Sequence, residues 1–387
     1  MSERFRNRLA ILPRAAINGL TTLGRRHRPA QPNRILIAHH LLLGDTLMLT
    51  ALIARLREQF PRAEIVMTVS PDYLPLYAGA PYGVKAVPWD PRAAKSFSAL
   101  QRTSNGVTAE SQFDLAFVPG DNRHALLARA LHSCWIIALA GDRPGWKNRI
   151  VDELVPAPRT AISLADMFAS LAGGADDLAF DPRAWPAPEF KPFAMPQAPY
   201  AMLHVGAGSA LRLWEAEKWR AVAAHFSSRG LHIVWSAGPG EESLVDAIAG
   251  SVQGRTDTNF AGKLDLSQLW HLTAGARILV ALDSGIAHLA KHTVTPTVCL
   301  YGPGSATLFG TGLFWRNAPF VGVTIDNFHC RDQTTVFKRD MSWVRRCQRV
   351  PGAQMTATTC PAAACMQAID VASVIAAADT LLAGGKK

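Results

Sequence analysis

Residues 260–304 read FAGKLDLSQLWHLTAGARILVALDSGIAHLAKHTVTPTVCLYGPG. The stretch predicts a helix over 266–275, a buried strand over 277–282, a second helix over 284–292 and a second strand over 296–301. Short apolar strands that alternate with helices are typical of βαβ units in a parallel sheet. The stretch therefore predicts the α/β class.

The same alternation extends in both directions from this stretch. Five further strands are expected in the first half, at 34–38, 64–70, 84–88, 113–118 and 134–140. In the second half two more are expected, at 200–205 and 231–236. Residues 182–199 hold six of the 25 prolines, which favours a linker. The pattern predicts two Rossmann-like domains that face each other across a cleft.

Five segments follow from this pattern. They are a basic amphipathic N-terminal segment (1–33), a first Rossmann-like domain (34–181), the proline-rich linker (182–199), a second Rossmann-like domain (200–360) and a C-terminal helix (361–387). The apolar C-terminal helix could pack back on the first domain.

Charge and composition restrict the class of protein further. Of the net charge of +10, residues 1–34 carry +7, from eight arginines and one acid, with apolar side chains between them. Such a mixture suits a helix lying on an anionic membrane surface, and a solvated tail is the alternative. The motifs of a nucleic-acid-binding module are absent. No apolar run approaches the ~20 residues of a membrane span, and six cysteines without a secretory signal favour a reduced, cytoplasmic setting.

Asp45 is the first candidate functional residue. It follows the first strand, in Leu43-Gly44-Asp45-Thr46, near the start of a helix whose backbone N–H groups favour an ionised carboxylate. An ionised carboxylate at the carboxyl end of a parallel sheet can act as a general base. The alternative is that Asp45 only caps its helix.

A glycine-rich turn follows the first strand of the second half, in His204-Val-Gly-Ala-Gly-Ser-Ala-Leu-Arg212. Gly206 and Gly208 let the backbone approach a ligand, whose phosphate the amides can bind, and Arg212 could pair with a diphosphate. The next strand ends in Ser236 instead of the acid that binds ribose in dinucleotide enzymes, so hydride transfer is disfavoured. Glu241 could accept hydrogen bonds from ribose, or could simply cap the following helix.

Asp283, Ser284, Gly285 and His288 form the most informative group. Asp283 ends a strand, Ser284 and Gly285 begin a helix, and His288 lies one turn further along it. The helix N–H groups could bind phosphate, whereas a buried core histidine is the alternative for His288. Ser284 lacks the G-x-S-x-G context of a hydrolase nucleophile.

Other motifs are missing. There is no G-x-x-x-x-G-K-[ST] sequence, which excludes a P-loop ATPase, and no D-x-D sequence of metal-dependent glycosyltransferases. The spacing of Cys330, Cys347, Cys360 and Cys365 matches no close-paired zinc motif, so we predict no metal site and leave the role of these cysteines open.

Together these segments resemble glycosyltransferase family 9, the lipopolysaccharide heptosyltransferases, which have the two-domain GT-B fold. The resemblance is strongest over residues 260–304. It extends to Leu42-Leu43-Gly44-Asp45, which is similar to the family's S-L-G-D motif, and to Cys365-Met366-Gln-Ala-Ile369, which is similar to its C-M-x-x-I motif.

The resemblance implies an inverting, metal-independent transfer, most directly of heptose from ADP-heptose to the lipopolysaccharide inner core, on the cytoplasmic face of the inner membrane. Asp45 would be the general base. The donor, which is a substrate and no cofactor, would be bound by Gly208, Ser209, Arg212, Glu241, Leu264, Asp283, Ser284, Gly285 and His288. Arg212 stands where the family usually has lysine. An anionic glycolipid acceptor would meet Arg92, Lys95, Arg143 and Lys147, which could equally be ordinary surface charges.

Two other functions share the two-domain shape. One is a GT-B-fold sugar-nucleotide epimerase, which needs more acids and histidines around the donor sugar than the sequence places there. The other is a non-catalytic relative that binds a nucleotide sugar or a lipid, against which the retention of Asp45 argues. The sequence names neither the donor sugar, the acceptor position nor the oligomeric state.

Overall fold

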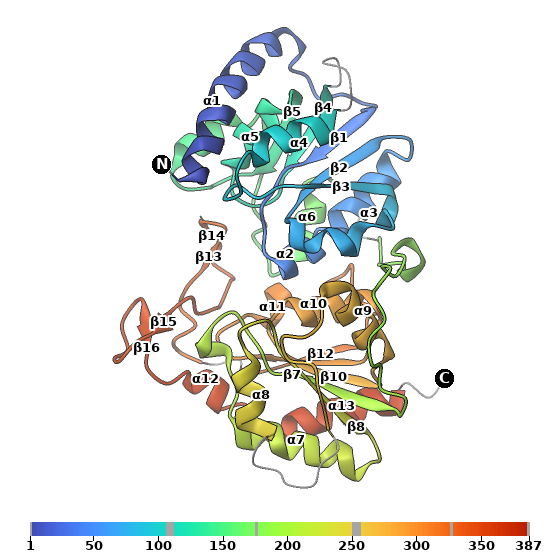
Figure 1. The fold of residues 1–387 in the computed structure, drawn as a ribbon. Helices are drawn as coiled ribbons and strands as arrows, with labels where there is room; N and C mark the ends of the chain where they lie inside the picture. Colours follow the sequence, from blue (N-terminus) through green and yellow to red (C-terminus); the bar gives the residue numbers. More distant parts are fainter. Residues whose placement is uncertain (1, 106–111, 175–176, 250–256, 326–327, 385–387) are drawn as a thin grey trace. The chain divides into compact units, whose positions relative to one another are not determined.

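A computed structural model describes residues 2–105, 112–174, 177–249, 257–325 and 328–384. The chain divides into two compact units. The first unit is Met1–Pro188 with Thr335–Trp343, and the second is Glu189–Thr334 with Val344–Lys387. The boundary after Pro188 falls within the proline-rich segment. Each unit is described by itself (Figure 1).

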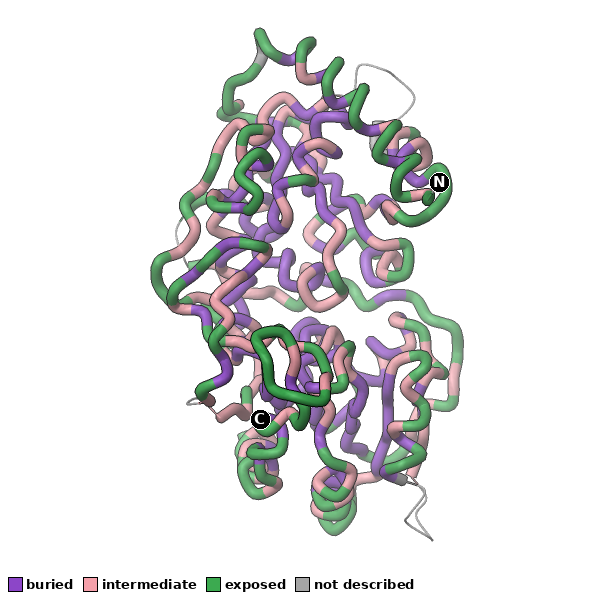
Figure 2. Tube along the Cα trace, turned by 90° about the vertical axis from the view of Figure 1, so that its left-hand side faces the viewer, coloured by how far each residue is buried: buried purple, intermediate pink, exposed green. Residues whose placement is uncertain are grey.

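The first unit is built on a parallel sheet in the order β3-β2-β1-β4-β5-β6. Its strands are β1 (Arg34–Ile37), β2 (Glu64–Val69), β3 (Val84–Pro88), β4 (Phe113–Val118), β5 (Ser133–Leu139) and β6 (Glu153–Val155). Its helices are α1 (Glu3–Thr21), α2 (Leu43–Met48), α3 (Thr50–Gln59), α4 (Ser96–Asn105), α5 (His124–Ala130) and α6 (Leu164–Ser170). The sheet lies between layers of helices, and its central strands are buried (Figure 2).

The second unit repeats this order, as β12-β11-β10-β7-β8-β9, again with every pair parallel. Its strands are β7 (Tyr200–His204), β8 (His232–Ser236), β9 (Thr258–Asn259), β10 (Ile278–Leu282), β11 (Thr297–Tyr301) and β12 (Phe320–Thr324). Its helices are α7 (Ala216–Ser228), α8 (Glu242–Ala249), α9 (Leu266–Gly275), α10 (Gly285–His292), α11 (Ala306–Phe309), α12 (Ala364–Gln367) and α13 (Val371–Gly384). Two parallel six-stranded sheets confirm the predicted α/β class.

Strand order decides where each unit can bind a ligand. In both sheets the order reverses between the first and fourth strands, at β1/β4 and at β7/β10. Loops that leave these two strands run in opposite directions over the sheet, so a crevice opens between them. Asp45 follows β1, whereas Asp283 and Ser284 directly follow β10.

The basic N-terminal segment is not a separate arm. Helix α1 packs along α5 and contacts α4, with Ile11 and Ala15 buried in the core of the first unit. Asn18 donates from Nδ2 to two carbonyls at the end of α5 (3.1 and 3.2 Å), and Asn7 donates to two carbonyls of the 91–93 loop. The outer side of α1 is exposed (Figure 2).

Two later segments also differ from the expected boundaries. Residues 335–343, which include the short pair β13 (Thr335–Val336) and β14 (Arg339–Asp340), belong to the first unit. The buried guanidinium of Arg339 holds them there, by donating to Gly120 O (2.9 Å) and Asn122 Oδ1 (2.5 Å). The other short pair, β15 (Val350–Pro351) and β16 (Thr359–Cys360), stays in the second unit.

The C-terminal helix belongs to the second unit. Helix α13 packs against α7 and strands β10–β12 of that unit. Val374 and Ala378 are buried in the unit's core, which explains the apolar composition of the helix. Packing on the first domain stays a prediction. In the described residues no helix is long and apolar enough to cross a membrane.

Candidate donor site in the second unit

The start of α10 offers unsatisfied polar groups. Ser284 is the N-cap residue, with extended backbone (φ −143°, ψ 171°), and its side chain makes no capping hydrogen bond. Asp283 Oδ2 and Ser284 Oγ are buried and have no hydrogen-bond partner within the described part of the chain. Burial of polar atoms without partners is costly, so these two atoms are ready to receive a ligand.

Arg212 lies beside this helix start. Its Nη1 donates to Asp283 O at 2.7 Å and lies 3.7 Å from Asp283 Oδ2. Burial raises the pKa of Asp283, and the charges of Arg212, Arg346 and Lys291 oppose that rise. A Cβ on Gly304 would collide with the Asp283 carboxylate, so the glycine is needed for this packing. The switch point of the second sheet thus combines a cation with a helix N-terminus, the two groups that bind anions.

Lys291 is a functional candidate that sequence reasoning missed. It is buried on α10, where Nζ donates to Phe309 O (2.8 Å) and Gly310 O (2.6 Å) and lies 3.4 Å from His288 Nδ1. An ammonium group only donates, so His288 Nδ1 accepts and Nε2 carries the proton. Burial, and then the charge of Lys291, hold the pKa of His288 well below its usual value. The expected core histidine and the expected ligand-binding histidine are therefore compatible: His288 is buried, neutral and a donor at Nε2.

Glu241 joins two loops of the second unit. Its carboxylate accepts from Ala207 N (3.0 Å) and Gly238 N (2.8 Å), and so ties the glycine turn after β7 to the loop after β8. A Cβ on Gly206 would collide with this carboxylate. Contact between Glu241 and a ribose stays a prediction.

The other expected donor residues lie in neighbouring turns. Ser209 caps a short 3-10 turn over Ala210–Arg212, and the position of a Cβ on Gly208 is open space. Leu264 is half-buried in the turn before α9. Their contact with a donor stays a prediction.

His204, at the end of β7, makes stability depend on pH. The side chain is 4% exposed, Nδ1 lies 2.6 Å from Ser236 Oγ, and burial lowers its pKa to about 4. In the unfolded chain the group titrates near 6.5, so the unfolded state binds the proton first as the pH falls. We expect the free energy of unfolding of the second unit to fall between pH 6.5 and about 4, by about 3 kcal/mol in total.

The measurement is urea unfolding of the wild type and of His204→Asn at pH 7.5, 6 and 5. Burial also lowers the pKa of His39, His124 and His292, so the difference between the two proteins is the informative quantity. Equal pH slopes for both proteins would contradict the prediction.

In the first unit, Asp45 lies in the first turn of α2 and is half-buried. Tyr73 lies nearby: its pKa is raised by burial first and then by the charges of Asp72 and Asp45. Two histidines follow β1, and each has a buried ring nitrogen. His39 Nε2 and His40 Nδ1 are buried with no hydrogen-bond partner among the described residues.

The four expected acceptor cations fall into two groups. Arg92, Lys95 and Arg143 are exposed, and Arg143 forms an ion pair with Asp340 at 2.5 Å. Lys147 is no surface charge: it is buried, with Nζ 2.9 Å from Asp142 Oδ1 and 3.0 Å from Asp121 Oδ1. Acceptor binding by these four stays a prediction.

The four late cysteines, despite their irregular spacing, line one cavity of about 120 Å³ together with His329. Burial raises the pKa of Cys330, and that of Cys365 to about 11, so both are thiols. In the described ranges no three His, Cys, Asp or Glu side chains are placed to hold a metal ion.

Comparison with known proteins agrees with the fold. The model of glycosyltransferase family 9 (heptosyltransferase) matches residues 175–340. Lipopolysaccharide heptosyltransferase 3 of Escherichia coli is 24% identical over 298 residues, which cover 70% of this chain and 83% of that protein.

Two solved structures from E. coli show the same fold. One is ADP-heptose lipopolysaccharide heptosyltransferase II, with a TM-score of 0.67 and 18% identity over 92% of this chain and 100% of that chain. The other is heptosyltransferase WaaC with ADP, with a TM-score of 0.61 and 18% identity over 75% of this chain and 93% of that chain.

Two Rossmann-type sheets with these structural matches show the GT-B fold. Within that fold, the chain is distantly similar to the heptosyltransferases of glycosyltransferase family 9.

Proposed function

We propose that this enzyme is an inverting glycosyltransferase. It transfers a sugar, most directly heptose from ADP-heptose, to the inner core of a lipopolysaccharide-type glycolipid. The observation that carries the proposal is the start of α10, where the buried Ser284 Oγ has no hydrogen-bond partner among the described residues and the Arg212 guanidinium donates to Asp283 O. A nucleotide sugar presents a diphosphate, whose negative charge is opposite to that of Arg212. Support for ADP as the nucleotide comes from the WaaC structure, which contains it.

The reaction then needs two groups of this chain. A bond forms between an acceptor hydroxyl oxygen and the anomeric carbon, while the bond from that carbon to the diphosphate breaks. The hydroxyl proton goes to the Asp45 carboxylate, acting as general base. The electron pair leaves with ADP, whose growing charge is stabilised by Arg212, the N–H groups of α10 and the Nε2 proton of His288.

The proposed location is the cytoplasmic face of the inner membrane, without a spanning helix. Residues 1–34 carry +7, and α1 exposes large apolar side chains outside the core. Each basic residue near an anionic surface contributes about 1 kcal/mol at low salt. An anionic glycolipid acceptor would be reached from that surface.

The direct test is ADP release from ADP-heptose by the purified protein, with and without a delipidated inner-core saccharide. We expect release that depends on the saccharide, with inverted linkage in the product. Release without any acceptor, or interconversion of the sugar, would support the epimerase alternative instead. Thermal protection by ADP without turnover would indicate a non-catalytic relative.

The proposed transfer does not need a metal ion, because the cation at the diphosphate is Arg212. We therefore expect turnover to persist in excess EDTA, within about twofold of the rate with magnesium. Complete loss of activity that magnesium restores would contradict this prediction.

A further inference from the structure

Two adjoining cavities of the first unit lie along α1, and together they are called the groove. The cavity at the C-terminal half of α1 has a volume of about 580 Å³, and the cavity at its N-terminal half has about 730 Å³. Leu12 of α1 and Leu126 of α5 line both. Side chains of both helices therefore line both cavities, and the two cavities differ in the polarity and charge of their lining.

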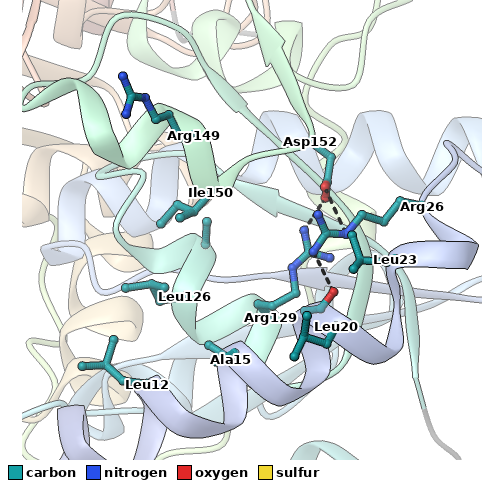
Figure 3. Close-up of a pocket in the computed structure, with 13 residues that line it drawn as sticks. Leu12, Ala15, Leu20, Leu23, Arg26, Leu126, Arg129, Arg149, Ile150 and Asp152 are labelled. Atoms are coloured by element: carbon teal, nitrogen blue, oxygen red, sulfur yellow. Dashed lines mark hydrogen bonds and ion pairs between the residues drawn. The ribbon is translucent and has the colours of Figure 1, made fainter.

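The C-terminal half of the groove is mostly apolar. Figure 3 shows Leu12 and Leu20 on α1, and Leu126 and Ile150 beyond it, around this half. Its charged lining consists of Asp152, the two arginines that pair with it, Arg26 (3.9 Å) and Arg129 (2.6 Å), and Arg149. This half matches an alkyl chain.

The N-terminal half of the groove is cationic. Its charged lining consists of one acid, Asp121, and the five cations Arg4, Arg8, Arg123, Lys147 and Lys338. Asp121 already pairs with Arg123 (2.8 Å) and Lys147 (3.0 Å), and these two partners hold its pKa far below its usual value despite burial. Lys338 lies further away, with Nζ 3.5 Å from Asp121 Oδ2. The remaining charge is positive, which suits an anionic group.

Two polar atoms in this cationic half lack partners. Trp89 is 3% exposed and His40 is half-buried; Trp89 Nε1 and His40 Nδ1 have no hydrogen bond within the described residues. His40 follows β1, whereas Asp121 and His124 follow β4, so this half lies at the switch point of the first sheet. It is where a parallel sheet of this order binds its ligand.

The apolar lining continues onto the surface. Leu12 is 48%, Leu20 70% and Leu23 56% exposed, and Phe5 and Leu9 extend the same stripe of α1. Exposed apolar stripes of this size on one helix indicate contact with a partner or a membrane. A lipid could enter the groove from that side without crossing polar surface.

We propose that the groove binds one anionic amphiphile, with its alkyl chain between Leu20 and Ile150 and its phosphate or carboxylate group among Arg4, Arg8 and Lys338. The proposal rests on the proposed function, because a lipid-linked acidic saccharide has this chemistry. It assigns the acceptor's lipid-proximal part to a site formed by α1, α5 and the loops after β1 and β4.

The test is calorimetric titration of the whole protein with dodecyl phosphate below its critical micelle concentration. We expect binding at least tenfold tighter than for neutral dodecyl maltoside or for inorganic phosphate. Dodecyl maltoside lacks the anionic group, and inorganic phosphate lacks the alkyl chain. Leu12→Trp fills the point that the two halves share and should weaken dodecyl phosphate binding at least tenfold. Ile17→Trp is the matched control, because Ile17 is 59% exposed on the same helix but lines neither half.

A second variant tests the cationic half. Arg8→Gln should weaken dodecyl phosphate and leave dodecyl maltoside unchanged, with the melting temperature of each variant checking the fold. Equal affinity of Leu12→Trp and wild type for dodecyl phosphate would contradict the proposed binding in the groove. Equal affinity for inorganic phosphate and dodecyl phosphate would also overturn it, in favour of a simple anion site.

A third result would contradict the groove: Leu12→Trp still binds vesicles, and monomeric dodecyl phosphate does not bind. In that case α1 is a helix that lies on the membrane surface. Failure of the groove can be told from failure of the proposed function. Turnover of the wild type on a delipidated acceptor tests the transferase without the alkyl chain that the groove is proposed to bind. A wild type that binds dodecyl phosphate but never releases ADP would refute the transferase and leave the groove standing.

Discussion

Asp45→Asn is expected to lower kcat by 10²-fold or more while leaving ADP binding unchanged. Asparagine keeps the size of the side chain but cannot take the proton of the acceptor hydroxyl, and removing a general base has about this effect. The residue lies in the first turn of the six-residue helix α2 and is half-buried, so the substitution should leave the core of the first unit intact.

Asp72→Asn is the matched control for that experiment. Asp72 is exposed, and both it and Asp45 raise the pKa of Tyr73, so the control removes the same charge from the same neighbourhood. We expect it to stay within about threefold of wild type, the usual range for a surface change away from the chemistry. Steady-state ADP release and thermal shift with ADP are the measurements. Near-normal turnover in Asp45→Asn would remove this residue from the mechanism.

Arg212→Ala is expected to have a comparable effect, on the other reactant. Its guanidinium lies beside Asp283, where we place the diphosphate, and loss of one preorganised donor to a developing negative charge costs about 10²–10³ in kcat. Arg212→Lys should recover most of the rate, because a lysine ammonium also binds phosphate as a point charge.

The alternative for Arg212 is a purely structural contact with the Asp283 carbonyl. In that case both variants would lower the melting temperature together with the rate, and lysine would not rescue either. Arg229→Ala is the matched control, since the Arg229 side chain is 49% exposed and pairs with Asp379 at the surface. A full rate in Arg212→Ala would refute the assignment of the diphosphate to the start of α10.

The central strands could be predicted closely because their runs are apolar and both faces of the sheets are covered. Strand 113–118 coincides with β4, and the expected strand 64–70 contains β2. The edge strand β3 was also predicted, at 84–88, whereas the edge strands β6, β9 and β12 were not, because no position in them is fully buried. Residues 46–60 were expected as one helix and form two, α2 and α3, divided at Leu49.

Candidate site residues could be predicted wherever they follow a strand directly. Asp45, Asp283 and Ser284 stand at the carboxyl ends of β1 and β10 because strand, turn and helix are consecutive in the chain. Lys291 could have been suspected from its place one turn beyond His288 on an otherwise apolar helix face. Its carbonyl partners, Phe309 and Gly310, come from another element, and spacing alone does not reveal them.

By itself, the sequence determined the α/β class, the repeated Rossmann-like pattern and the strand-end positions of Asp45 and Asp283, since these depend on local periodicity and turn chemistry. Only the tertiary structure decided which distant segments share a surface. Arg339 returns to the first unit, Lys147 is buried against Asp142, and α1 packs on α5 to create the groove. Such pairings depend on desolvation and on which buried polar groups find partners, and both arise only when elements far apart in sequence are packed together.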